Sequence, residues 1–332
     1  MAPPPDKQLM GLLKDVSRSF YLTLRVLPGT IRPQIGLAYL LARTTDTIAD
    51  TDFVPPDQRL GALDQLRRRI LGTRSDALDF AAFTQRQGAP AEGRILELCE
   101  TSLAWLQALP APDRLLVREV LTTITSGQEL DLRRFACAPA GRLVALRTPA
   151  ELDDYTYRVA GCVGEFWTKM CRAHVFPKAK LDDALLLAQG VRFGKGLQLV
   201  NVLRDLPADL RQGRCYLPAE QFPAGLTPED LLEPANEIRL RPLYDSWLDQ
   251  AQAHLAAGWD YTNALPRVCV RVRLACAWPL LLGFETLKLL RTGKALDPRH
   301  RIKVSRAQLK RIMARSILCY PWPAAWKRLA TA

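Results

Sequence analysis

A long apolar stretch that ends in carboxylates dominates the helical pattern of this chain. It reads LLLAQGVRFGKGLQLVNVLRDLPAD and covers residues 185–209. From Leu185 to Leu203 the apolar side chains recur at three- and four-residue steps, the pattern of a helix face packed against a core. Similar patterns occur at residues 35–48, 96–109, 115–132, 243–256 and 270–290. Because no alternating pattern bounded by Asn-Gly or Asp-Gly turns accompanies them, the sequence predicts an all-α protein.

The breaks between these helical runs are short and none is low in complexity. They fall at residues 51–57, 72–93, 136–148 and 213–226. Thr148, Thr227 and Ser305 each begin a segment with N-cap chemistry, a hydroxyl followed three residues later by a side chain that can reach back. No internal repeat appears. We therefore expect one domain over residues 1–332, with a flexible N-terminus at about 1–10 and a basic C-terminal segment at 297–332.

The positive charge of the chain is concentrated near its C-terminus. The 332 residues contain 46 Lys and Arg against 34 Asp and Glu, a net charge of +12, yet residues 288–332 contain twelve of the basic residues and one acid, Asp297. The other 287 residues are therefore almost neutral. A hydrophobic content of 48% with 24% charged residues is typical of a globular protein and excludes a disordered or collagen-like chain. The basic segment indicates an anionic partner.

Cysteine usage and the chain start favour a cytoplasmic protein. The eight cysteines include no Cys-x-x-Cys pair and the three histidines are isolated, so a zinc site is not expected and the thiols are predicted to be reduced. The first residues lack the apolar core of a secretory signal. The longest uncharged run near the C-terminus, residues 274–284, is about half the length of a membrane-spanning helix. No transmembrane segment is predicted.

A first pair of carboxylates, Asp46 and Asp50, stands at the end of the helical run over residues 35–48. Residues four apart share a helix face, so the two carboxylates project to the same side and repel each other. The negative end of the helix dipole adds a second electrostatic cost. Two such costs at one place indicate a bound cation that offsets them. Arg43, one turn before Asp46, is suited to hold an anion that this cation also touches.

A second acidic segment follows the opening stretch. Asn201, Asp205 and Asp209 place three hard oxygen donors along one helix face, and Pro207 is expected to kink the helix between them. Nearby cationic side chains are Arg204, Arg211 and Arg214. Oxygen donors of this kind suit Mg²⁺, which prefers a few carboxylates, water and substrate phosphate.

Either acidic pair alone has a simple alternative explanation, because acid pairs occur by chance on many solvated helix faces. Two pairs, each with an arginine in the same turn of an otherwise apolar helix, favour chemistry instead. A diphosphate leaving group needs metal ions and cationic side chains that neutralise its charge as the carbon–oxygen bond breaks. The other class of function, a basic helical module that binds nucleic acid or a membrane without chemistry, fits less well, because a DNA surface would reject these acids.

Segments spread from Ser17 to Gln308 resemble the squalene/phytoene synthases, a family of head-to-head prenyl transferases. The resembling segments are Ser17-Arg18-Ser19-Phe20, the aspartate-rich LLARTTDTIAD (40–50) and QLVNVLRDLPADLRQGRCYLP (198–218), YTYRVAGCVG (155–164) and Trp278-Pro279. The resemblance implies an isoprenoid-synthase helical bundle around a central apolar cavity, with both aspartate motifs at its mouth. Gly161 and Gly164 would then permit close helix packing or leave room for a chain-like ligand.

The resemblance also implies roles for individual residues. Tyr155, favoured over Tyr157, would face the reacting carbons and handle a proton or stabilise positive charge. The metal ligands for Mg²⁺ would be Asp46, Asp50, Asn201, Asp205 and Asp209. The residues that bind the two farnesyl diphosphate substrates would be Ser17, Arg18, Ser19, Arg43, Gln198, Arg204 and Arg214. Among them Arg43, Arg204 and Arg214 would complete the site for the diphosphates.

Two reactions within the family remain open. A squalene synthase would form presqualene diphosphate and then reduce it with hydride from NADPH; non-reducing relatives would make dehydrosqualene, phytoene or presqualene diphosphate itself. Residues 300–308, His-Arg-Ile-Lys-Val-Ser-Arg-Ala-Gln, resemble a late segment of squalene synthases that meets NADPH phosphate, although serine stands at 305 where arginine is common. This resemblance favours squalene synthase, with Lys303, Arg306 and Asn201 as cofactor-binding residues. The alternative for the segment is a solvated basic helix start.

The remainder of the basic segment, residues 310–328, contains Trp322 and Trp326. Tryptophan and arginine together suit an anionic membrane surface, and a peripheral contact there would receive a water-insoluble product. Packing of both tryptophans on the protein body is the alternative. No nucleic acid is expected as a partner. The sequence leaves the oligomeric state, the chain-length selectivity and the downstream pathway open.

Overall fold

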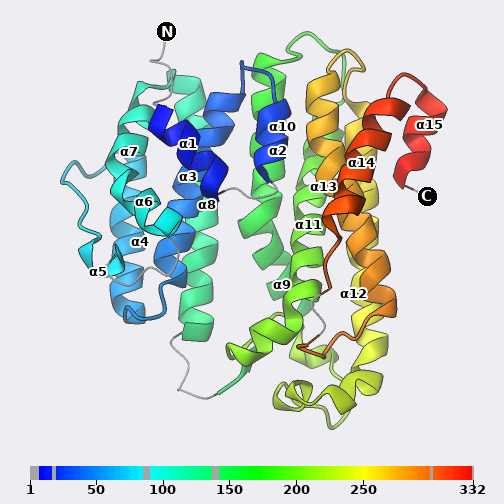
Figure 1. Cartoon of the computed structure of the whole chain (residues 1–332). Helices are drawn as coiled ribbons and strands as arrows, with labels where there is room; N and C mark the ends of the chain where they lie inside the picture. Colours follow the sequence, from blue (N-terminus) through cyan, green and yellow to red (C-terminus); the bar gives the residue numbers. More distant parts are fainter. Residues whose placement is uncertain (1–6, 17–19, 85–89, 137–141, 300–301, 331–332) are drawn as a thin grey trace. The chain divides into compact units, whose positions relative to one another are not determined.

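Helices make up 77% of the structure, a computed structural model that describes residues 7–16, 20–84, 90–136, 142–299 and 302–330 (Figure 1). This confirms the predicted all-α class. The α-helices are α1 (Lys7–Val16), α2 (Phe20–Val26), α3 (Arg32–Asp50), α4 (Pro56–Leu71), α5 (Ala81–Thr84), α6 (Pro90–Glu97), α7 (Cys99–Ala108), α8 (Ala111–Asp131), α9 (Pro149–Thr156), α10 (Cys162–His174), α11 (Asp183–Arg211), α12 (Glu237–Ala264), α13 (Val270–Thr292), α14 (Arg306–Cys319) and α15 (Pro323–Lys327). Residues 1–6, the start of the predicted flexible N-terminus, lie outside the described residues.

Helix boundaries follow the capping chemistry of the sequence. Thr148 accepts a hydrogen bond from the backbone N–H of Glu151 at the start of α9. Ser305 and Gln308 form a reciprocal capping box at the start of α14. Thr227 and Asp230 exchange the same kind of contacts, but the segment they begin is a single 3₁₀ turn, Glu229–Leu232. The predicted run 96–109 is divided at Leu98, between α6 and α7.

The sequence predicts no strands, and the described residues contain only one very short pair. β1 (Val144–Ala145) and β2 (Arg214–Cys215) are parallel, with Val144 opposite Arg214. The ladder forms where Gly213, in the left-handed region at φ 76°, turns the chain after α11. The backbone N–H of Val144 donates to Gly213 O at 2.9 Å. A pair this short has no alternating pattern long enough to be detected in the sequence.

The chain divides into two compact units. The first comprises residues 1–137 and 166–177, and the second comprises residues 138–165 and 178–332. Within the first unit, α3 packs against α8 and α4, and its buried face includes Leu37, Leu40, Leu41 and Ile48. Of the apolar stripe predicted over residues 35–48, Ile35, Ala38, Leu41 and Ile48 are buried. Its helix ends at Asp50, so both carboxylates of the first pair lie in the last turn and a half.

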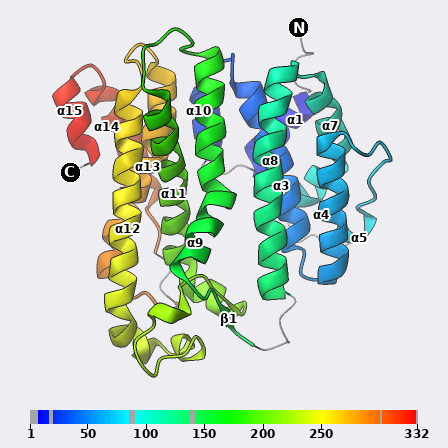
Figure 2. The same ribbon diagram turned by 180° about the vertical axis from the view of Figure 1, so that it is seen from behind.

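The second unit is built around α11, which lies beside α12 and α13 in both views (Figures 1 and 2). Pro207 lies inside α11 and does not end it, since the helix continues to Arg211. The prediction of one domain over residues 1–332 stays a prediction, as does the central apolar cavity.

Glycine lets the helical segment that follows Tyr155 approach α11 at backbone distance. A methyl group added to Gly164 would lie 1.9 Å from Gly190 O, and one added to Gly194 would lie 2.0 Å from Ala160 O. No side chain fits at either position. Of the two roles that the sequence left open for the glycines of this segment, close packing therefore applies to Gly164.

Seven described cysteines carry free thiols, and five of them are buried. This agrees with the predicted reduced state. Burial raises the pKa of the Cys99, Cys162 and Cys215 thiols to about 12, so they remain protonated core side chains. Among the described residues, no helix combines the length and the apolar character that a membrane crossing requires.

We predict that Gly164→Ala destabilises the protein strongly, by about 2–4 kcal/mol, because the added methyl group forces α11 away from the segment that carries Tyr155. The matched control is Gly61→Ala in α4, where nothing lies within 4 Å of the added methyl group. That change should stabilise the helix by roughly 0.5–1 kcal/mol. Urea unfolding measures both. Equal effects at the two positions would contradict the packing argument.

Candidate active site

The first acidic pair is embedded in polar contacts within the first unit. The Arg43 guanidinium lies 3.7 Å from Asp46 Oδ2, and its other nitrogen donates to Glu92 Oε1 at 2.7 Å. The Gln128 amide from α8 donates to Asp46 Oδ1. Asp46 is half-buried, whereas Asp50 at the helix end is exposed. Arg43 therefore lies beside Asp46 as predicted, but it also forms an ion pair with Glu92.

The repulsion that the spacing of Asp46 and Asp50 predicts is reflected in the pKa of Asp46. The pKa of the Asp46 carboxyl is raised to about 6, first because surrounding protein withdraws it from water and next because Asp50 repels its negative charge. Arg43 and Gln128 offset part of this effect. Near neutral pH the first pair therefore contains a carboxylate whose charge is incompletely neutralised by the protein itself.

The second acidic segment lies on α11 and includes an arginine paired with its neighbour. Arg204 Nε and Nη2 donate to the two oxygens of Asp205 at 2.9 and 2.5 Å. Asn201 Nδ2 donates to Gln198 Oε1 at 3.3 Å. Gln198, Asn201, Asp205 and Asp209 are three or four residues apart, so they follow one face of the helix over about 16 Å.

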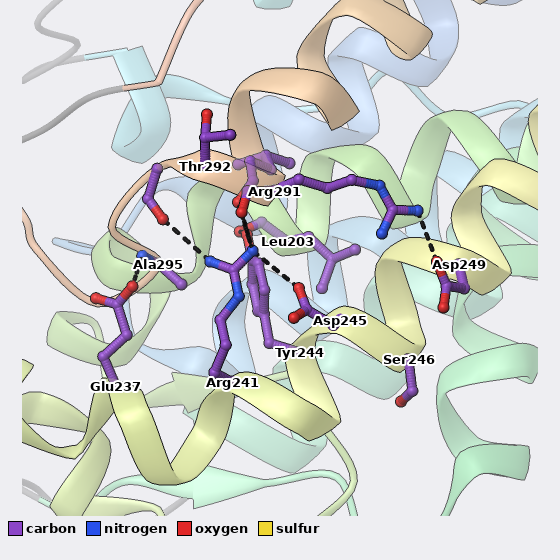
Figure 3. A network of polar contacts seen from close by, with 12 residues as sticks. Leu203, Glu237, Arg241, Tyr244, Asp245, Ser246, Asp249, Arg291, Thr292 and Ala295 are labelled. Atoms are coloured by element: carbon purple, nitrogen blue, oxygen red, sulfur yellow. Dashed lines mark hydrogen bonds and ion pairs between the residues drawn. The ribbon is translucent and has the colours of Figure 1, made fainter.

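A buried tyrosine supplies the hydrogen bond that α11 lacks because of Pro207. Proline has no N–H, so the carbonyl of Leu203 loses the partner that a helix normally provides four residues later. The hydroxyl of Tyr244, which is fully buried in α12, donates to Leu203 O at 2.9 Å (Figure 3). Burial raises the pKa of Tyr244, which keeps this donor protonated. The contact lies two residues before Asp205 and supports the helix where the acidic segment begins.

Neighbouring contacts hold α12 to the end of α13 (Figure 3). Arg241 pairs with Asp245 at 2.8 Å and donates to the carbonyls of Leu290, Arg291 and Gly293. Leu290 and Arg291 lie in the last turn of α13, whose carbonyls a helix leaves without internal partners, and Gly293 directly follows that helix. Glu237 accepts a hydrogen bond from the backbone N–H of Ala295 at 2.9 Å. The chain that leads from α13 toward Lys303 is thereby fixed at its start.

Tyr155 lies in α9 and is buried within the second unit. Its hydroxyl oxygen accepts a hydrogen bond from Gln198 Nε2 at 3.2 Å, and its ring stacks on Tyr216 with centroids 4.4 Å apart. Tyr157 instead donates to Glu165 at 3.3 Å and lies beside Lys195. A π-helical turn, Tyr157–Gly161, separates α9 from α10 and redirects the side chains between them. The sequence offered no signal for this turn.

The remaining predicted residues are distributed as follows. Ser17, Arg18 and Ser19 lie outside the described residues. Arg214 lies in β2 and donates to Gln212. Lys303 and Arg306 are exposed on either side of the capping residue Ser305.

The sequence analysis missed four residues that support the candidate site: Glu92, Gln128, Tyr216 and Tyr244. Glu92 contacts Arg43 from 49 residues away, Gln128 contacts Asp46 from 82 residues away, and Tyr244 reaches α11 from α12. Contacts at such separations leave no periodic pattern in the sequence. Tyr216 lies within the second aspartate-rich motif, but nothing in the sequence indicates that its ring stacks on Tyr155.

The donors present fit a magnesium ion by their chemistry. Carboxylate and amide oxygens occur on one helix face in the second unit and as an i, i+4 pair in the first. Within the described residues, no group of three or more His, Cys, Asp or Glu side chains gathers closely enough to hold a metal by itself. Mg²⁺ normally takes only one or two protein carboxylates and completes its shell with water and substrate phosphate.

The model of the squalene/phytoene synthases matches residues 13–308 of this sequence. The chain belongs to the squalene/phytoene synthase family. It is therefore a prenyl transferase that joins its substrates head to head, in a family that is typically metal-dependent. This confirms the resemblance drawn from the two aspartate-rich motifs and the Tyr155 segment.

Curated relatives include two presqualene diphosphate synthases. The one from Rhodopseudomonas palustris is 30% identical over 87% of this chain and 89% of its own length, and the one from Sinorhizobium fredii is 31% identical over 76% and 77%. A bifunctional lycopene cyclase/phytoene synthase from Gibberella fujikuroi is 29% identical over 73% of this chain. The match spans only 40% of that longer protein.

Solved structures share the fold. The squalene synthase TcSQS, in complex with a ligand, superposes with a TM-score of 0.75 at 20% identity, covering 93% of this chain and 86% of its own. A dehydrosqualene synthase gives a TM-score of 0.61 at 22% identity, covering 94% and 96%. These likenesses confirm the isoprenoid-synthase helical fold.

The raised pKa of Asp46 predicts that Asp46→Asn stabilises the metal-free protein at pH 7.5. The carboxyl titrates near 6 when folded and near 4 when unfolded, so its ionised form weakens the fold above pH 6 and this cost vanishes below about pH 4. Asparagine keeps an acceptor for Gln128 without the charge. We expect a gain of roughly 1 kcal/mol after allowance for solvent screening at this half-exposed side chain.

Urea unfolding in the presence of a chelator, at pH 7.5 and pH 4, measures this gain. Asp249→Asn is the matched control, since Asp249 is an exposed carboxylate on α12 that pairs with Arg291. The control should change stability little at either pH. A gain for Asp46→Asn that persists at pH 4 would contradict the electrostatic origin.

Proposed function

We propose that the protein condenses two molecules of farnesyl diphosphate head to head into presqualene diphosphate in a Mg²⁺-dependent reaction. The observation that carries this proposal is the single face of α11 that runs from Gln198, bonded to Tyr155, through Asn201 to Asp205 and Asp209. Two relatives that are named presqualene diphosphate synthases, 30 and 31% identical over most of both chains, support it.

The two ends of this face suit the two ends of an allylic diphosphate. Asp205 and Asp209 offer anionic oxygens for metal ions that bind diphosphate, while Tyr155 and Tyr216 offer stacked aromatic rings. An aromatic face stabilises positive charge, and an allylic substrate becomes cationic once its diphosphate departs. The helix therefore separates the group that leaves from the carbons that react, as the condensation requires.

The acidic segments and the arginines bind the diphosphates in this proposal. Bound Mg²⁺ neutralises diphosphate charge and so eases ionisation of the carbon–oxygen bond. Asp205 is freed for this role when Arg204 turns from its carboxylate toward the phosphate. The metal ligands are Asp46, Asp50, Asn201, Asp205 and Asp209. The substrate-binding residues are Ser17, Arg18, Ser19, Arg43, Gln198, Arg204 and Arg214, of which the arginines Arg43, Arg204 and Arg214 complete the anion site.

Tyr155 acts on the cation formed when the second prenyl double bond has attacked the first substrate. Closing the cyclopropane ring of presqualene diphosphate releases one proton, and the phenol oxygen of Tyr155 assists its removal. Gln198 orients this oxygen through the 3.2 Å hydrogen bond, and Tyr216 holds the ring from its face. Tyr157, which donates to Glu165, has no part in this step.

A second candidate function is full squalene synthesis, in which NADPH reduces the rearranged intermediate. The observation that favours it is the start of α14, where the Ser305–Gln308 capping box orders a helix N-terminus flanked by exposed Lys303 and Arg306. Cationic side chains at a helix N-terminus suit a phosphate group. Asn201 is the further residue proposed to contact the cofactor. Synthesis of dehydrosqualene or phytoene is the non-reducing alternative.

Product analysis with farnesyl diphosphate and Mg²⁺ separates these candidates. We predict that presqualene diphosphate forms without NADPH and that a chelator abolishes its formation. If the second candidate holds, NADPH converts the product to squalene. In that case Lys303→Glu should lower squalene formation while presqualene diphosphate still forms, and Lys310→Glu, at the exposed lysine of α14, should behave as wild type.

The outcomes are distinct. Presqualene diphosphate that accumulates with NADPH present supports the first function alone. Dehydrosqualene or phytoene as the product, whether or not NADPH is present, contradicts both. If the protein formed products from geranylgeranyl diphosphate but not from farnesyl diphosphate, the proposal of farnesyl diphosphate as the substrate would be contradicted.

We predict that Asp205→Asn lowers kcat by about a hundredfold or more, because it removes a charged ligand that neutralises the diphosphate in the transition state. The side chain keeps its size, so the free energy of unfolding should change little. Asp249→Asn, the same chemical change on an exposed part of α12, serves as the control and should keep wild-type turnover. Normal turnover of Asp205→Asn with Mg²⁺ would refute the assignment of the second acidic segment.

A further inference from the structure

Five exposed apolar side chains gather on two segments of the second unit. Val268 belongs to the connection between α12 and α13, and Val270 is the first residue of α13. Ile317, Leu318 and Trp322 belong to the end of α14 and the turn into α15. Their exposed fractions are 88, 38, 52, 69 and 64%. The two segments lie at the same end of this unit (Figures 1 and 2). We call these five side chains the apolar tip.

Hydrogen bonds join the two segments although about 50 residues separate them. The hydroxyl of Tyr320 donates to Arg267 O at 2.6 Å, and the Arg267 guanidinium donates to Pro321 O at 3.2 Å. Val268 directly follows Arg267 in the sequence, and Trp322 directly follows Pro321. The tip is therefore one surface built from both segments.

A buried anchor holds this surface from below. Trp326 is 2% exposed, stacks on Trp259 with centroids 5.3 Å apart and donates to Asn263 Oδ1 at 3.0 Å. The Arg273 guanidinium lies 5.4 Å from its ring and 5.6 Å from the ring of Tyr320. The two C-terminal tryptophans thus have different roles: Trp326 packs on the protein body, while Trp322 faces outward.

The backbone around Trp322 has few polar groups that need water. Pro321 and Pro323 have no N–H. The N–H of Trp322 donates to Cys319 O at 3.1 Å, and its carbonyl accepts from the N–H of Trp326 at 2.9 Å. Pro321 O accepts from Arg267. A turn whose backbone groups are already paired can enter an apolar medium at low cost, whereas an ordinary loop cannot.

The surroundings of the tip are cationic. Arg267 and Arg271 flank Val268 and Val270 in the sequence, and Arg315 lies one helical turn before Leu318. All three arginines are exposed. No Asp or Glu occurs at residues 261–284 or 298–332. Charge complementarity therefore favours an anionic partner. A second copy of this surface would bring like charges together.

We propose that the apolar tip docks the protein on the surface of an anionic lipid bilayer, with Trp322 and Leu318 inserted at the headgroup level and the arginines against lipid phosphates. Tryptophan is favoured at that depth, and clustered arginines bind negatively charged leaflets. This docking uses none of the proposed catalytic residues, so it stands or falls independently of the reaction. The sequence predicted membrane contact by residues 310–328 in general. The proposal assigns this contact to the apolar tip, which also includes Val268 and Val270.

Co-sedimentation of the purified full chain with lipid vesicles tests the proposal. We expect binding to vesicles of phosphatidylcholine with about one third phosphatidylglycerol, and much weaker binding to phosphatidylcholine alone. The combined variant Val268→Ser, Leu318→Ser, Trp322→Ser should bind the anionic vesicles at least about tenfold more weakly. The matched control is Ile238→Ser, which removes a side chain that is 85% exposed at the start of α12 in the same unit.

Thermal unfolding of both variants checks that the fold persists, since the altered side chains are exposed. If the triple variant melts early, the single variant Trp322→Ser gives the same test with a smaller expected loss. Wild-type protein that ignores anionic vesicles, or a triple variant that binds them as wild type does, would overturn the proposal. So would gel filtration in which the wild type is a dimer and the triple variant a monomer, because the tip would then contact a second copy.

Discussion

The second unit depends on one constraint, that α11 serves both as the central core helix and as the carrier of the acidic segment. Its core half approaches the Tyr155 segment so closely that only glycine fits at residues 164 and 194. Its acidic half contains Pro207, which removes a helical hydrogen bond just where the carboxylates begin. The buried hydroxyl of Tyr244 replaces the lost donor at Leu203 O. A continuous helix, with Gln198 and Asp209 on one face, depends on both arrangements.

Electrostatic strain distinguishes the candidate site from the rest of the molecule. Elsewhere, a surface carboxylate such as Asp249 pairs with an arginine at an ordinary distance, in this case Arg291 at 2.6 Å. Asp46 instead stays near Asp50 with only partial compensation from Arg43, which Glu92 also engages, and its pKa rises to about 6. In the second segment the compensation comes from Arg204 on the neighbouring residue. In the proposed function, these acids exchange an internal partner for a metal ion with its diphosphate.

The sequence predicted these features to the extent that they are local. The helical stripes, the N-caps at Thr148 and Ser305, and the position of each acidic pair at a helix end depend on neighbouring residues only, and the structure agrees. The π-helical turn after Tyr157, the stacking of Tyr216 and the contacts of Gln128 and Tyr244 depend on tertiary packing between distant segments. No periodicity encodes them. The kink expected at Pro207 stays a prediction, and the donor that Tyr244 supplies there comes from another helix, which no sequence pattern shows.

The same reasoning explains why the C-terminal charge belongs to more than one function. Net charge alone suggested a single anionic partner for residues 288–332, but burial divides the segment. Asp297 is buried and pairs with Arg299, and Trp326 is fixed to α12 and α13, so part of the segment belongs to the fold. Lys303 and Arg306 are exposed at a capped helix start, which is the proposed site for the phosphate of NADPH. Trp322 and Leu318 face outward at the opposite end of α14, where the prolines and paired backbone groups suit lipid. A helix of 14 residues is about 21 Å long, so the two surfaces are far enough apart to bind different anions at the same time.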